Sequence, residues 1–61
     1  MRYFTIQTES KTLAERVANY LMDNGIYYTV AEMGIYTDVV FYGDNETRDG
    51  VADFVHGYAL A

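Results

Sequence analysis

Acidic side chains gather in the stretch GDNETRDGVADF, which begins at Gly43. Asp44, Glu46, Asp49 and Asp53 offer carboxylate oxygens, the ligands that Ca²⁺ and Mg²⁺ prefer. Their spacing differs from that of an EF-hand loop, and the glycine needed at its sixth position is missing. Carboxylates at the start of a helix are also stabilised by the helix dipole, which explains most of this cluster without an ion. We therefore expect no metal ion and no cofactor.

His56 and Ser10 are the single histidine and the single serine of the chain, and there is no cysteine. Histidine is the most common general acid or base in enzymes, but it needs a partner group. Ser10 is better explained as a helix cap, which leaves no Ser-His-Asp arrangement. A histidine near the end of a helix is favoured by the dipole alone. We expect the protein not to be an enzyme.

Tyrosine is abundant, with seven residues in a chain of 61. Aromatic side chains on an open sheet stack on bases in RNA-recognition domains. Nine acidic against four basic side chains give a formal net charge of −5, however, and this field repels phosphate backbones and anionic lipid. We expect no direct binding to nucleic acid or membrane, and we expect a protein partner that is basic.

The length predicts one domain over residues 1–61 with a thin margin of stability. Domains of this size commonly gain stability from disulfides, a metal or a partner subunit. The absence of cysteine excludes disulfides and thiolate metal sites, and a single histidine makes a structural zinc site unfavourable. A partner subunit is the remaining route, so we expect a homodimer. The absence of cysteine also favours a reducing compartment. No apolar run approaches the roughly 20 residues of a spanning helix, and no signal-peptide pattern is present. We expect a cytoplasmic protein.

Strand and helix periods alternate along the chain. Residues 2–8 alternate as a strand. Helical spacing of apolar residues follows and ends at Gly25, the predicted left-handed stop. Ser10 is the predicted N-cap of this helix, and a capping box of Thr12 and Glu15 is the alternative. Residues 26–32 and 35–42 predict two further strands, and a second helix follows a cap at Asp44 or Asn45. Its predicted buried stripe consists of Val51, Phe54, Val55 and Tyr58.

Met33 and Gly34 lie between the last two strands and predict a hairpin with a two-residue turn. A longer loop is the alternative, because Met-Gly is not a favoured pair for such a turn. With the two-residue turn, Val30 pairs with Thr37, and Ile26 pairs with Phe41. The resulting core face of the sheet is expected to contain the following side chains: Phe4, Ile6, Ile26, Tyr28, Val30, Ile35, Thr37, Val39 and Phe41.

The order is therefore β-α-β-β-α, an α+β fold in two layers. A right-handed crossover makes the first two strands parallel, and the hairpin places the third between them, in the order 1-3-2. We expect a three-stranded mixed sheet with both helices on one face. The arrangement resembles a truncated ferredoxin-like fold that lacks its last strand.

Two surfaces remain uncovered in this arrangement: the outer edge of the first strand and the second face of the sheet. Exposed edges invite pairing, and large apolar patches mark interaction sites. The expected partner-binding residues on this face are Tyr3, Tyr27, Tyr36, Asp38, Val40 and Tyr42. Tyrosine suits such a role because it has a large apolar body and a polar tip.

In its compositional style, small, acidic, rich in tyrosine and without a catalytic set, the chain resembles the inhibitors that phages make against host enzymes and defence systems. That resemblance implies a non-enzymatic protein-protein interaction domain in the host cytoplasm, directed against a nucleic-acid-handling or defence protein. The alternative is a small-ligand-binding regulatory module, in which two subunits hold a metabolite between tyrosine-bearing sheets.

Overall fold

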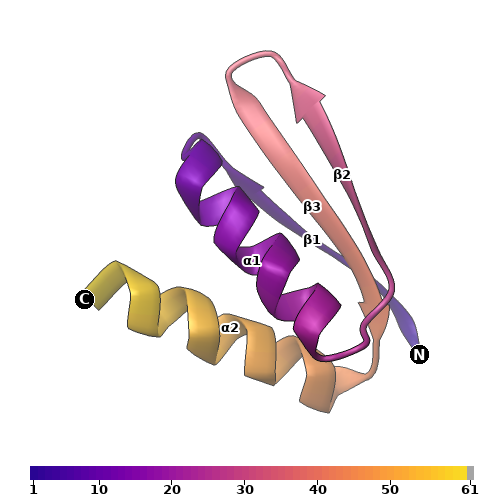
Figure 1. The fold of residues 1–61 in the computed structure, drawn as a ribbon. Helices are drawn as coiled ribbons and strands as arrows, with labels where there is room; N and C mark the ends of the chain where they lie inside the picture. Colours follow the sequence, from indigo (N-terminus) through magenta and orange to yellow (C-terminus); the bar gives the residue numbers. More distant parts are fainter. Residues whose placement is uncertain (61) are drawn as a thin grey trace.

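The computed structural model describes residues 1–60, and for the last two of these only the backbone. Five elements follow one another along the chain (Figure 1). They are β1 (Arg2–Thr8), α1 (Lys11–Asp23), β2 (Tyr28–Met33), β3 (Tyr36–Gly43) and α2 (Asn45–Leu60). The predicted β-α-β-β-α layout is confirmed. No helix within the described part of the chain is both long and apolar enough to cross a membrane.

The three strands form one sheet in the order β1-β3-β2, as predicted. β1 and β2 run parallel to each other on the outside, and each pairs antiparallel with β3. Both hydrogen-bonded ladders are therefore antiparallel, so the sheet is an antiparallel one, although we had expected it to be mixed. The two helices lie on the same side of this sheet (Figure 1).

Local hydrogen bonds explain where α1 begins and ends. The Ser10 side chain accepts from the backbone amide of Leu13 at 3.1 Å, which satisfies one of the free donors of the first turn. At the other end Gly25 has a φ of +68°, a conformation that favours glycine. The amide of Gly25 donates to Met22 at 3.1 Å, and the amide of Ile26 donates to Leu21 at 2.9 Å. This pair of bonds is a Schellman motif, which turns the chain toward β2.

The hairpin between β2 and β3 corrects the predicted register. Met33 pairs with Tyr36, so the turn residues are Gly34 and Ile35 rather than Met33 and Gly34. Gly34 has a φ of +69° and Ile35 does not have a positive φ. This matches a type II′ turn, which takes glycine at its first central position. Val30 consequently pairs with Val39 instead of Thr37.

The register change shifts every partner of β2 by two residues, so each side chain stays on its predicted face. Two packing predictions nevertheless fail. Ile35, expected beneath the helices, is 73% exposed because it occupies the turn. Val30 is 48% exposed because a hollow, lined on the α1 side in part by the small side chains of Ala14 and Ala18, remains between it and the helix. β2 also begins at Tyr28 rather than Ile26.

α2 begins at a cap supplied by Asp44, one of the two predicted residues. Its carboxylate accepts from the Thr47 backbone amide at 2.8 Å and from the Thr47 hydroxyl at 2.9 Å. These hydrogen bonds, the backbone one first, lower the pKa of the Asp44 carboxyl. The cap fixes the direction in which α2 leaves β3.

The core is small and comes from three elements. Its buried apolar side chains are Ala14, Val17 and Leu21 of α1, Val39 and Phe41 of β3, and Val51 of α2. The helices also meet through Tyr20 and Phe54, whose stacked rings lie 4.6 Å apart. Phe4 and Ile6 of β1 remain partly exposed at the margin of this core. The layer of helices is therefore well packed over β3 and thin over β1.

Candidate functional site

The sheet face opposite the helices, called the open face below, is crossed by a row of three tyrosines. Tyr3 of β1 pairs with Tyr42 of β3, and their ring centroids lie 4.8 Å apart. On the other side of Tyr42 lies Tyr27, whose carbonyl accepts from the Tyr42 amide at 3.0 Å. Tyr3 and Tyr27 are each 64% exposed. The row therefore presents aromatic surface across the full width of the sheet.

Two further rows follow along β3. Val40 lies between Thr5 and Thr29, and Asp38 lies between Gln7 and Ala31. Tyr36, which is 39% exposed, ends the face beside the hairpin turn. The structure thus brings all six residues expected to bind a partner onto one face, although their role in binding stays a prediction: Tyr3, Tyr27, Tyr36, Asp38, Val40 and Tyr42.

Asp38 is the single carboxylate among those six residues, and it lies in mid-sheet. Its Oδ1 atom is buried and has no hydrogen-bond partner among the described residues. Leaving a buried polar atom unpaired costs about 1–3 kcal/mol, and more for a charged group. The centre of the open face therefore holds a carboxylate that the described residues do not fully satisfy.

The other acidic residues do not join this surface. Asp44 caps α2, and Asp49 accepts from Arg48 at 3.0 Å on the same helix. α2 packs on the opposite side of the sheet, so Glu46, Asp49 and Asp53 are separated from the tyrosine row. Within residues 1–60 no three acidic or histidine side chains are placed to share a metal ion.

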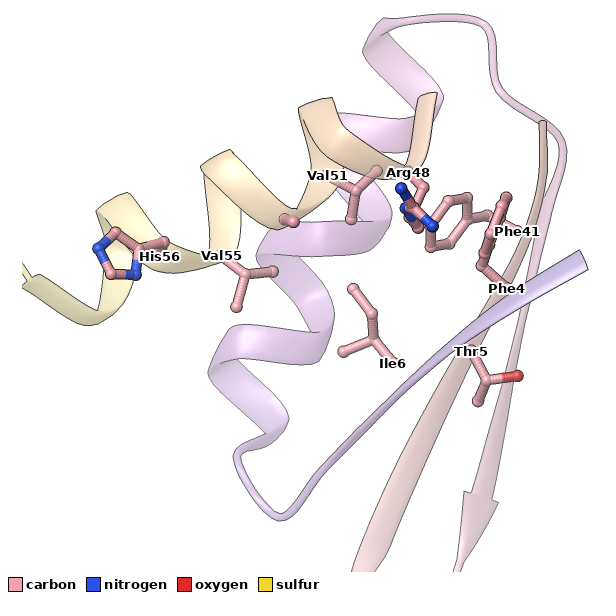
Figure 2. A pocket seen from close by; sticks show the side chains of 9 residues that line it. Phe4, Thr5, Ile6, Phe41, Arg48, Val51, Val55 and His56 are labelled. Carbon is pink, nitrogen blue, oxygen red and sulfur yellow. The ribbon is translucent and has the colours of Figure 1, made fainter. Parts of the chain in front are cut away.

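A second feature was missed at the sequence level: an apolar cavity of about 510 Å³ between β1 and α2 (Figure 2). Phe4 and Ile6 of β1, Phe41 of β3, and Val51 and Val55 of α2 supply its apolar walls. Arg48, Ala52, His56 and Thr5 complete the lining. In Figure 2 the side chains of Ile6 and Val55 point into this space, and Thr5 points away from it.

The cavity exists because α2 diverges from β1 after Val51 has entered the core. The one sequence signal for it is that Phe4 and Ile6 have helix-side positions on an outer strand, where little material remains to cover them. His56, considered above as an acid or base, lies at the rim of this cavity. None of the four tyrosines of the open face lines it.

Comparison with models of protein families, with curated proteins and with solved structures finds no match.

Proposed function

We propose that the protein is a non-enzymatic protein-protein interaction domain that associates with itself and binds a basic protein through the open face. The observation that carries this proposal is the row Tyr3, Tyr42, Tyr27, which runs from β1 across β3 to the residue that precedes β2. Tyrosines hold contact area at a low entropic cost and are enriched among the residues that dominate binding energy.

Asp38 supports a partner that is basic. Its carboxylate is only partly buried, and its cross-strand neighbours Gln7 and Ala31 are uncharged, so an incoming Lys or Arg meets no competing cation there. A charge-assisted hydrogen bond to a carboxylate is worth about 1.5–3 kcal/mol. The net charge of −5 steers such a partner toward the protein at low salt. Inhibition of a host nucleic-acid-handling or defence protein in the cytoplasm fits this chemistry, because those proteins present basic clefts.

The test is affinity capture from the source cell, followed by titration of the purified captured protein. We expect Tyr27→Ala and Asp38→Asn each to weaken its binding at least tenfold. Both side chains lie on the open face, and neither belongs to the buried core. Circular dichroism checks that both variants keep the fold.

Met22→Ala is the matched control, because Met22 is 59% exposed on α1, on the other side of the molecule. It should bind as the wild type does. Unchanged affinity of Tyr27→Ala and Asp38→Asn for the captured protein would contradict the assignment of this face.

A regulatory module for a small ligand is the second candidate, and the cavity between β1 and α2 favours it. A volume of about 510 Å³ lies within the range of known ligand sites. The site differs from the tyrosine-lined one first expected. A rise in melting temperature with an apolar metabolite, abolished by Ala52→Phe, would support this candidate.

A further inference from the structure

The outer edge of β1 carries none of the features by which proteins protect an exposed strand. Such edges are usually blunted by proline, bulges, short strands or charges that point inward. β1 is seven residues long, pairs with β3 without a bulge, and contains one charged residue, Arg2, at its start. Within residues 1–60 it pairs with β3 alone. By contrast, the edge strand β2 carries Glu32, which lies 3.9 Å from Lys11.

The apolar cavity opens at this same edge. Phe4 and Ile6 border it with their side chains, and Thr5 borders it although its side chain belongs to the open face. The cavity therefore reaches the backbone of β1 between those two residues. A strand that pairs with β1 would place alternate side chains directly beneath α2. A single added strand would therefore pair with the free backbone groups of β1 and also fill the apolar cavity beneath α2.

We infer that this occupant is β1 of a second copy of the chain, paired antiparallel about a two-fold axis at Thr5. The sequence of β1 is self-complementary about that residue. Phe4 of one copy lies beside Ile6 of the other, and the symmetry repeats the contact. Each pair falls on the helix side, where it fills the cavity beside Val51 and Val55. Thr5 faces Thr5, a favourable cross-strand pair.

The charges favour this pairing over a parallel one. Arg2 and Arg48 lie at the same end of β1, with their guanidinium carbons 5.0 and 5.9 Å from the centre of the Phe4 ring. Glu9 follows the other end of β1. Antiparallel pairing brings Glu9 of each copy toward the two arginines of the other. Parallel pairing would instead place Arg2 against Arg2 and Glu9 against Glu9.

The resulting assembly is a continuous six-stranded sheet with all four helices on one side. Its two open faces form one surface that carries two tyrosine rows. The inference deepens the self-association in the proposed function, but it is independent of target binding, because the edge and the open face are different surfaces.

Charged substitutions of Thr5, the residue at the proposed two-fold axis, test the antiparallel pairing of β1 with its copy. We expect the wild type to have the mass of two chains in light scattering at micromolar concentration. Thr5→Lys should weaken the dimer several-fold, since it opposes two lysines at the axis. Thr5→Glu should act in the same way. Mixing the two variants should restore a dimer that contains one chain of each.

Thr29→Lys is the matched control. Thr29 and Thr5 flank Val40 on the same face, but Thr29 belongs to the opposite edge of the sheet. It should leave the dimer unchanged. Equal weakening by Thr29→Lys would place the contact on the open face and overturn the inference, as would a monomeric wild type. Failure of the mixed variants to associate would also overturn it.

A second measurement covers the case in which the charged variants fold poorly. The chain has no cysteine, so Thr5→Cys introduces a single thiol beside its symmetry mate. Mild oxidation should link two Thr5→Cys chains and should not link two Thr29→Cys chains. Equal crosslinking of both variants would contradict the edge pairing, whatever the target of the open face proves to be.

Discussion

Asp38 is the residue at which the needs of the fold and of the proposed function conflict. An isolated sheet gains nothing from a carboxylate in mid-strand, because aspartate is disfavoured in strands and its Oδ1 here has no partner among the described residues. Removal of the carboxylate should therefore stabilise the fold while it weakens the binding of a basic partner. Such a trade is common where a site is kept for function.

Asp38→Thr tests this trade. We expect it to raise the free energy of unfolding by about 1 kcal/mol, since it removes an unpaired buried oxygen and adds a β-branched side chain. Urea denaturation measures the change. Gln7→Thr is the control, because Gln7 pairs with Asp38 on the same face and shares the gain in strand propensity without the carboxylate. An equal gain in both variants would show that the carboxylate carries no cost.

Residue types alone identified all six candidate side chains of the open face, because alternation in a strand assigns each residue to one side. The same alternation gave a wrong prediction for Ile35, which was expected in the core but is exposed in the hairpin turn. Both possible two-residue turns preserve the faces of the strands, so hydrophobic alternation does not distinguish them. The choice depends on Gly34, which takes the positive φ of the first turn position.

At the scale of elements, the start and stop of α1 followed from local hydrogen bonding and were predictable for that reason. The exposure of Val30 was not, because it depends on how closely α1 packs against β2. The cavity was missed for a similar cause. It results from the direction of α2 relative to β1, which no spacing within α2 reveals.

Gly57 and Gly50 offer a test of packing along α2. A side chain carbon added at Gly57 would meet no described atom within 4 Å apart from its chain neighbours and the backbone of its own helix, whereas one added at Gly50 would lie 3.1 Å from the Tyr20 hydroxyl oxygen. Gly57→Ala should therefore stabilise the protein by about 0.5–1 kcal/mol through helix propensity. Thermal denaturation should show a smaller gain, or a loss, for Gly50→Ala. The reverse order would contradict the close approach of the two helices.

At the scale of the whole molecule, the small core makes stability depend on association. The six buried apolar residues of the described part of the chain leave β1 poorly covered, and the proposed partner strand would supply the missing cover. The melting temperature should therefore rise with protein concentration, as mass action requires of a dimer that is more stable than its subunits. A hundredfold increase in protein concentration stabilises the dimer by about 2.7 kcal/mol relative to its unfolded chains. Calorimetry over that range of concentration would detect the rise in melting temperature. A constant melting temperature, with Thr5→Lys identical to the wild type, would indicate a self-sufficient monomer.

The tyrosine row also makes the protein its own optical probe. The chain contains no tryptophan, so its near-ultraviolet emission comes from tyrosine alone. Tyr3, Tyr42 and Tyr27 lie side by side on the surface proposed to meet the target. A target that places a tryptophan against them would receive their excitation energy, and tyrosine emission would fall as tryptophan emission rose. Docking could then be followed in real time without a label or a change in the sequence.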